Sequence, residues 1–140
     1  MEQQIDNLTR HFDVDNINIV VGFKKDLIME SFPDITYIYN QLFDQTNTSK
    51  SLLKALKKNH REPVLWLNGD VVFDSDILKE LMPTIVANKS FVCVNTQKVG
   101  DEEVKYTLDK QGFINELSKR VKNGIREAVG INFISSKDIN

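Results

Sequence analysis

The chain has 140 residues, of which 41% are hydrophobic and 27% are charged, a composition typical of one soluble globular domain. With 18 basic and 20 acidic side chains the formal net charge is −2, and no long run of either sign indicates a nucleic-acid-binding surface. The apolar runs are far shorter than the ~20 residues that span a bilayer, and the first residues do not form a signal peptide. We therefore expect one cytoplasmic domain with no nucleic-acid partner and no membrane partner.

The first part of the chain alternates between helical and strand-like patterns. In chain order we predict a helix at residues 1–12, a strand at 17–22, a helix at 24–31, a strand at 35–39 and a loop at 40–46. Asn47 then precedes a helix whose apolar face carries Leu52, Leu53 and Leu56. Alternating helices and strands predict a parallel sheet covered by helices.

Residues 64–67 are four consecutive apolar residues that end at the polar turn Asn68-Gly69-Asp70. This pattern predicts a fully buried strand of a parallel sheet. Ligands of open α/β sheets bind beyond the carboxyl ends of the strands, so Asp70 is well placed to hold a divalent metal ion next to a phosphate. The alternative is a plain turn in which Asp70 accepts hydrogen bonds from nearby backbone amides. The residues alone leave both interpretations open.

The second half of the chain is predicted to be mostly β-structure. Residues 75–87 have helical spacing, with Asp74 or Ser75 as the cap, and Pro83 is expected to break this helix near Leu81. Strands follow at residues 90–95, 103–108, 113–117 and 128–134, and the turn at 109–112 joins the middle two into a hairpin. Cys93 is the single cysteine and is expected to be a small core residue. These later strands form an added mixed portion of the sheet.

Three short segments follow one another in an order that is typical of one enzyme family. They are Asn47-Thr48 with Ser51-Leu52 at a helix start, then Leu67-Asn68-Gly69-Asp70, then Glu127-Ala128-Val129-Gly130-Ile131. Together they resemble the sugar-phosphate and phosphocholine nucleotidyltransferases. Those enzymes join a nucleoside triphosphate to a phosphorylated sugar or alcohol and release pyrophosphate. The resemblance implies a Rossmann-like, GT-A-related α/β fold, with a mostly parallel sheet, helices on both faces and an added antiparallel β portion.

The resemblance also implies a role for each matching residue. Asp70 matches the carboxylate that holds Mg²⁺, the expected cofactor, between the phosphates. Lys119 matches a lysine that reaches the acceptor phosphate, and Asp70 and Lys119 are the expected catalytic residues. Substrate-binding positions are expected at Glu127 on the acceptor side and at Asn47, Thr48 and Ser51 on the nucleotide side.

Each of these positions also has a structural interpretation. Lys119 is then one of several solvated charges, Glu127 is a surface partner of Arg126, and the three polar residues at 47, 48 and 51 cap a helix. Tests of the site have to separate the two interpretations.

Two features of the family are not found in the sequence. Family members begin with a strand and a glycine-rich loop that cradles the triphosphate, and Gly22 alone cannot form such a turn. For the second metal-binding carboxylate, Asp138 is the only candidate. We therefore expect one nucleotidyltransferase-like domain over residues 1–140 that is incomplete at the N-terminus, and its completeness at the C-terminus stays open. The cytidylyl-, uridylyl- or thymidylyltransferase type, and the activity of this form, stay open.

Two other functions stay open as well. One is a non-catalytic binding or assembly module derived from such an enzyme, and the other is a generic flavodoxin-like domain. If the family's strand order holds, a first strand is missing between residues 17–21 and 64–67. Either these two strands then pair directly, or a second copy completes the sheet, because each buried backbone group without a partner costs about 1–3 kcal/mol. We expect the homodimer.

Overall fold

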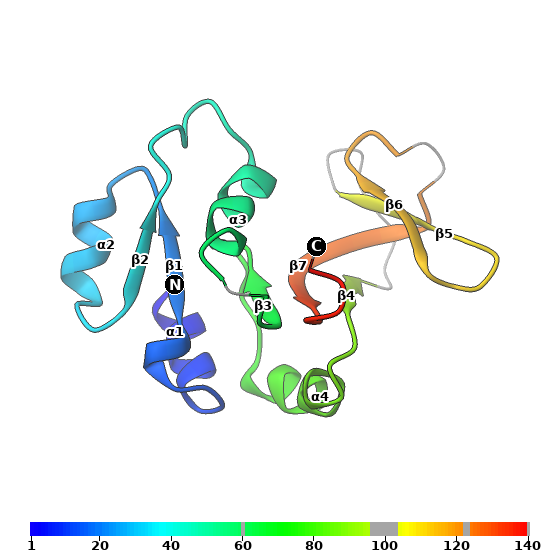
Figure 1. Cartoon of the computed structure of the whole chain (residues 1–140), viewed down its shortest axis with the longest axis horizontal. Coiled ribbons are helices and arrows are strands. Elements are labelled where there is room, and N and C mark those ends of the chain that lie inside the picture. The colour runs from blue at the N-terminus through cyan, green and yellow to red at the C-terminus, as the bar shows by residue number, and fades with distance from the viewer. Residues whose placement is uncertain (60, 96–103, 122–123, 140) are drawn as a thin grey trace.

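The computed structural model describes residues 1–59, 61–95, 104–121 and 124–139 (Figure 1). Its elements in chain order are α1 (Glu2–Thr9), the 3-10 helix η1 (Val14–Asn16), β1 (Asn18–Val21), α2 (Lys25–Ser31), β2 (Thr36–Tyr39), α3 (Thr48–Leu56), β3 (Val64–Leu67), α4 (Ser75–Val86), β4 (Phe91–Asn95), β5 (Lys105–Leu108), β6 (Ile114–Ser118) and β7 (Arg126–Ile134). None of the helices in these ranges is long and apolar enough to cross a membrane.

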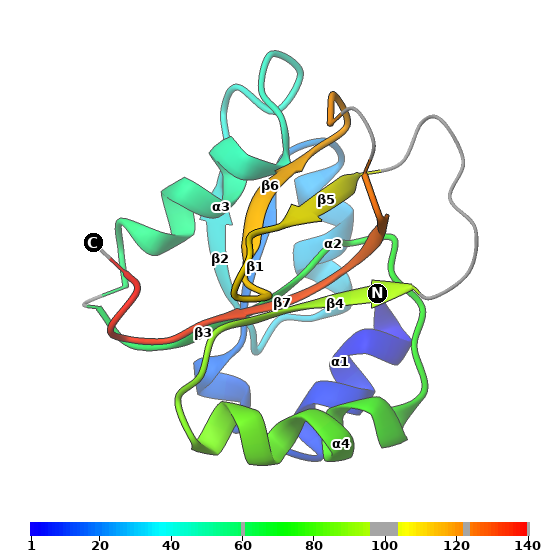
Figure 2. The same cartoon turned by 90° about the vertical axis from the view of Figure 1, so that its right-hand side faces the viewer.

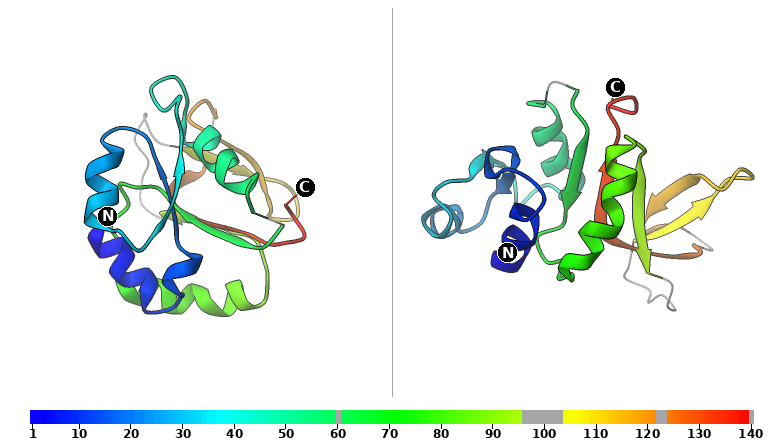
Figure 3. Two further views of the ribbon diagram at one scale, coloured as in Figure 1. Left: turned by 60° about the vertical axis from the view of Figure 1, so that its left-hand side comes forward. Right: turned by 90° about the horizontal axis from the view of Figure 1, so that it is seen from below.

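The strands form two sheets. β1 and β2 pair in parallel, and β7 is the central strand of a second sheet in which every pairing is antiparallel. Figure 3 shows β1, β2 and α2 at one end of the molecule and the β5–β6 hairpin at the other. The predicted α/β class with an added antiparallel portion is confirmed, and so is the hairpin at residues 109–112.

Residues 64–67 form a strand as predicted, but its neighbours differ from the prediction. β3 pairs antiparallel with β7, and its four residues are half-buried rather than fully buried. Among the described residues no strand lies on the second edge of β3 or on the second edge of β1. The direct pairing of residues 17–21 with residues 64–67 was therefore a wrong alternative for this structure.

Helix α4 is continuous from Ser75 to Val86, so the break expected near Leu81 was wrong. Asp74 caps the helix, since its carboxylate accepts a hydrogen bond from the backbone amide of Asp76 at 3.0 Å. Pro83 cannot donate a hydrogen bond, but it lies on the exposed face, where water can bond the carbonyl that loses its partner. The opposite face of the helix is anchored in the core.

The main core lies between the second sheet and the helices α1 and α4, which lie side by side beneath β3, β4 and β7 (Figure 2). Phe73, Leu78 and Ile131 are its buried members, and Leu78 has an exposed fraction of 0%. Cys93 packs against this cluster, as expected for a small core residue, and burial raises the pKa of its thiol. This packing fixes the end of β3 and the loop that follows it.

Candidate functional site at the end of strand β3

Asp70 lies in the loop at residues 68–73 that joins β3 to α4. The loop begins with a tight turn, in which the backbone amide of Val71 donates to the carbonyl oxygen of Asn68 at 3.2 Å. Asp70 is exposed, and no amide in the described part of the chain donates to its carboxylate. The segment is a turn, but the hydrogen bonds from backbone amides to Asp70 that the plain-turn alternative expects are not found in the described residues, and the carboxylate oxygens are available to a ligand.

Helix α1 holds this loop from one side. The side-chain amide nitrogen of Gln4 donates to the carbonyl oxygens of Asn68 at 3.0 Å and of Val71 at 2.5 Å. The side-chain amide of Asn7, one turn further along the helix, donates to the carbonyl oxygen of Phe73 at 3.0 Å. Gln4 and Asn7 are both buried. Their side chains therefore satisfy backbone carbonyls that leave the regular sheet.

Strand β7 holds the loop from the other side. The backbone amide of Asn68 donates to the carbonyl oxygen of Gly130 at 2.9 Å. Gly130 has a φ of 81°, and a Cβ atom there would lie 2.7 Å from the Nδ2 atom of Asn68. A side chain at this position would therefore collide with the loop. Glycine is required because β7 and the loop approach each other so closely.

The strands β3 and β5 share one edge of β7, because β4 occupies the other edge. Phe133 is paired with both Leu65 of β3 and Phe91 of β4, while Glu127 is paired with both Lys105 of β5 and Asn95 of β4. The loop after β3 joins β7 at Gly130, and the amide of Ala128 donates to the carbonyl of Val104 at 2.9 Å. These two points are two residues, or ~7 Å, apart along β7. The Asp70 loop therefore lies next to the start of β5.

Glu127 belongs to a row of paired residues that crosses the sheet. It lies opposite Lys105, which in turn lies opposite Ser118 at the end of β6. Directly opposed residues project from the same face of a sheet. A carboxylate and an ammonium group thus occupy neighbouring positions beside the loop that carries Asp70.

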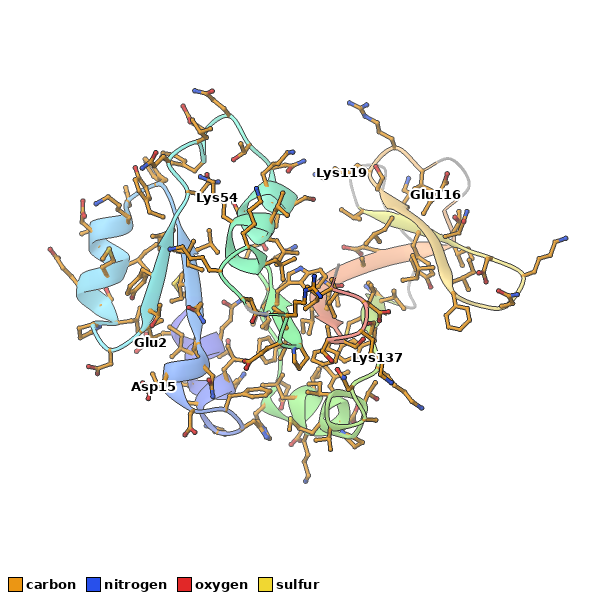
Figure 4. The ribbon with its side chains drawn as sticks, viewed as in Figure 1. Glu2, Asp15, Lys54, Glu116, Lys119 and Lys137 are labelled. Atoms are coloured by element: carbon orange, nitrogen blue, oxygen red, sulfur yellow. The ribbon has the colours of Figure 1, made fainter. Side chains whose placement is uncertain are left out.

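Lys119 follows this row but is further from the loop. It is exposed and comes directly after β6, two strand spacings or ~10 Å from β7. In the view of Figure 4 it projects from the hairpin toward the side on which α3 carries Lys54. The loop that carries Asp70 thus joins β7 three residues, or ~10 Å, from Glu127, and Lys119 lies two strands away from β7.

The three residues expected on the nucleotide side lie at the start of α3. The side-chain oxygen of Asn47 accepts a hydrogen bond from the amide of Lys50 at 3.2 Å, so Asn47 is the N-cap. The hydroxyl of Ser51 accepts a hydrogen bond at 2.9 Å from the side-chain amide of Asn40, which is buried. Thr48 is exposed. Asn47 and Ser51 have structural partners, so a ligand role there would be an additional one.

Asp138 lies at the opposite end of the β3–β7 pair from Asp70. Val64 at the start of β3 is paired with Ile134, whereas Leu67 at its end is paired with Ile131. Asp138 follows Ile134, so the length of β3, on the order of 10 Å, separates it from the Asp70 loop. Its carboxylate accepts hydrogen bonds from the hydroxyls of Ser90 and Ser135. As a second carboxylate for a metal at Asp70, Asp138 was a wrong candidate.

The residues around Asp70 suit a metal ion that is shared with a substrate. No group of three or more His, Cys, Asp or Glu side chains in the described ranges could hold a metal by itself. Magnesium is commonly bound through one or two carboxylates together with phosphate oxygens and water. A single exposed carboxylate in a fixed loop fits that mode, and it does not fit a site built from protein ligands alone.

The sequence patterns missed three residues of this site. Gln4 and Asn7 are polar residues in a short helix for which only the apolar positions had been interpreted. Lys105 falls within the strand predicted at residues 103–108, and only the register shows it opposite Glu127. Gly124 lies close to Lys105, because a Cβ atom at Gly124 would collide with the Cβ atom of Lys105.

Comparisons with known proteins show the family of this chain. The family model described as MobA-like NTP transferase domain matches residues 1–129. The Bifunctional protein GlmU of Methanococcus maripaludis (strain C5) is 30% identical over 139 residues, which are 97% of this chain and 31% of that protein. The protein of the same name from Methanococcus vannielii is 38% identical over 85 residues, 58% of this chain and 19% of its own. The chain thus spans less than a third of the length of these relatives.

Two solved structures have the same fold. The inositol-1-phosphate CTP transferase from T. maritima superposes with a TM-score of 0.69 at 13% identity, over 97% of this chain and 57% of that chain. A putative glucose-1-phosphate thymidylyltransferase from Bacillus anthracis, in complex with a sucrose, gives a TM-score of 0.71 at 15% identity, over 97% and 58%. The predicted fold class and the resemblance to nucleotidyltransferases are confirmed.

Proposed function

Because this chain belongs to the family of MobA-like NTP transferase domains, we propose that it serves the transfer of a nucleoside monophosphate from a nucleoside triphosphate to a phosphorylated sugar or alcohol. In this reaction a phosphate oxygen of the acceptor bonds to the α-phosphorus, and the bond from that phosphorus to the departing pyrophosphate breaks. The observation that carries the proposal is the exposed Asp70 carboxylate at the end of β3, in a loop that Gln4 and Gly130 hold through hydrogen bonds to both sides.

The site residues divide between the two substrates. Asp70 would hold Mg²⁺ together with the phosphates, and the ion would neutralise charge that develops on their oxygens. Lys119 would contact the acceptor phosphate, and Glu127 would accept hydrogen bonds from the acceptor's polar groups. The start of α3, with Asn47, Thr48 and Ser51, would face the nucleotide. The two solved structures are named as a CTP transferase and a putative thymidylyltransferase, and these names support a pyrimidine nucleotide.

The 140 residues contain no two glycines at the spacing of a phosphate-cradling loop. Phosphoryl transfer depends on positioning and charge neutralisation, so we expect no detectable turnover from this chain alone. The same observation supports a second candidate function, a non-catalytic binding or assembly module that retains the acceptor side. Pyrophosphate release from CTP, UTP or dTTP by the purified chain, if lost in Asp70→Asn, would overturn the expectation of inactivity.

Titration calorimetry tests the role of Asp70. We expect Mg²⁺-dependent binding of CTP, UTP or dTTP to the wild type and its loss in Asp70→Asn, which removes the charge and keeps the size. Asp34→Asn is the matched control. Asp34 is also an exposed aspartate, but it lies before the amino-terminal end of β2, whereas Asp70 lies after the carboxyl end of β3. Unchanged Mg²⁺-dependent binding in Asp70→Asn, or no such binding in the wild type, would contradict the proposed metal site.

The open strand edges support a homodimer. We place the protein in the cytoplasm because nucleoside triphosphates, the proposed substrates, are made and used there. β1 and β3 each present one edge without a partner among the described residues. Such edges favour pairing with another chain, and a second copy is the partner we propose. Light scattering over a wide range of dilution should show a dimer at high concentration. A well-folded monomer at every concentration would exclude it.

A further inference from the structure

We propose that Gln4 is a positioning residue that sets the conformation of the loop carrying Asp70. Its consequence for nucleotide binding rests on the proposed function, whereas its effect on the loop does not. Gln4 lies 66 residues before Asp70 in the sequence, in helix α1, whose buried amides bond the carbonyls of the loop.

The hydrogen bonds of Gln4 show why this side chain suits the task. A glutamine amide has two N–H donors, and both are used here. One bond ends on the carbonyl of Asn68 at 3.0 Å and the other on the carbonyl of Val71 at 2.5 Å. These carbonyls flank the two residues Gly69 and Asp70. One side chain thus ties together the two ends of the turn that presents the carboxylate.

The turn has few other contacts that could maintain its shape. Apart from Gly69 and its two chain neighbours, no described residue has an atom within 4 Å of the position that a Cβ atom of Gly69 would take. Asp70 is exposed. The remaining bond within the turn joins the amide of Val71 to the carbonyl of Asn68 at 3.2 Å. The orientation of Asp70 therefore depends on the anchors at both ends, and Gln4 contacts both of them.

Gln4 is also placed so that its loss cannot be replaced easily by water. Its exposed fraction is 8%, and the helix that carries it packs against α4. Without the amide, the two carbonyls would lose donors in a region with little access to solvent, and the loop would move to find others. Asn7 would still hold Phe73 at 3.0 Å, so the change would be confined to the turn.

The substitution Gln4→Met tests the proposal, because methionine keeps the approximate size and has no donor. Gln3→Met is the matched control, with the same chemical change at an exposed neighbour on the same helix. Amide hydrogen exchange is measured at Val71, which reports on the turn, and at Leu78 and Ile131, which report on the core. We expect exchange at Val71 to be about 10-fold faster in Gln4→Met than in Gln3→Met, with Leu78 and Ile131 unchanged.

Equal exchange at Val71 in the two variants would overturn the proposal. So would a uniform increase at Val71, Leu78 and Ile131, because it would show a general contribution to stability instead of positioning. Gln4→Glu is a second variant in case Gln4→Met does not fold. The introduced carboxyl regains an O–H donor when it is protonated, and burial raises its pKa. We expect the protection of Val71, corrected for intrinsic exchange, to recover as the pH is lowered through that pKa.

The nucleotide titration separates this proposal from the proposed function. If both hold, the affinity for Mg²⁺ with the nucleoside triphosphate falls about 5- to 10-fold in Gln4→Met and stays unchanged in Gln3→Met. Faster exchange at Val71 without any Mg²⁺-dependent nucleotide binding in the wild type refutes the proposed function and supports the role of Gln4 in the loop. Binding that needs Asp70 but is the same in Gln4→Met refutes the positioning role.

Discussion

A Cβ atom at Gly130 would lie 2.7 Å from the side-chain nitrogen of Asn68. This close approach joins the central strand of the large sheet to the loop that carries Asp70, because Asn68 also donates its amide hydrogen to the carbonyl of Gly130 at 2.9 Å. The central strand β7 and helix α1 thus enclose the loop from opposite sides. The position of Asp70 follows from long-range contacts and not from the turn sequence alone.

Gly130→Ala should destabilise the protein by more than Gly112→Ala. Both glycines have a positive φ, 81° and 87°, which costs an alanine about 1–2 kcal/mol. Only at Gly130 would the added methyl group also collide with the loop, since no atom lies within 4 Å of the corresponding position at Gly112. Urea denaturation of the two variants measures the difference. Equal losses of unfolding free energy would show that the contact with Asn68 carries no cost.

Asp138 should make the stability depend on pH in the acid range. Hydrogen bonds from Ser90 and then Ser135 lower the pKa of its carboxyl below the ordinary value. A lowered pKa in the folded state stabilises the protein above the pKa of the unfolded state, and this contribution is lost as the pH falls through the folded value. In Asp138→Ala the difference from the wild type should be constant near neutral pH and shrink as the pH falls from about 5 to 2.

The control for this experiment is Asp34→Ala, an exposed aspartate with no hydrogen bond to its side chain among the described residues. Its stability curve should run parallel to that of the wild type over the same range. If the curve of Asp138→Ala also runs parallel, the serine hydroxyls do not stabilise the Asp138 carboxylate.

Cys93 should react slowly with iodoacetamide in the folded protein. Burial raises the pKa of its thiol, so less of the reactive thiolate is present at pH 8 than in an exposed cysteine. The rate should rise about 10-fold or more when urea unfolds the chain, with glutathione in the same urea as the reference for the reagent. An equal rate in the folded and unfolded protein would mean that Cys93 is accessible and does not pack against the core.

Local patterns in the sequence predicted most of the elements, because their causes are local. Asn47 and Asp74 are polar residues directly before helical spacing, and both cap helices in the structure. Strand β3 and the turn that connects β5 to β6 were also predicted correctly, because four consecutive apolar residues and a turn sequence are local patterns. The effect of Pro83 on the helix was predicted wrongly. Proline leaves one backbone carbonyl of the preceding turn without a donor, and the helix continues if that carbonyl faces water. The sequence alone does not show which carbonyls face water.

The candidate site was predictable only where a single residue carries the signal. Asp70 follows an apolar strand, which is visible in the sequence. The contributions of Gln4 and Lys105 depend on pairings across the fold, between α1 and the Asp70 loop and between β5 and β7. The antiparallel pairing of β3 with β7 separates Asp138 from Asp70, although both are aspartates that follow strands. Register between distant strands is set by the packing of the whole domain.

The role of Asp70 as the metal ligand is tested by locating a bound paramagnetic ion through its effect on the amide signals of the protein. Mn²⁺ added with UTP broadens the amide signals of nearby residues in a nuclear magnetic resonance spectrum of the uniformly labelled chain. The account predicts that Gly69, Asp70 and Val71 broaden first in the wild type, and that this preference is lost in Asp70→Asn. Broadening centred on Asp138 at the opposite end of β3, or no preference for the Asp70 loop, would contradict it.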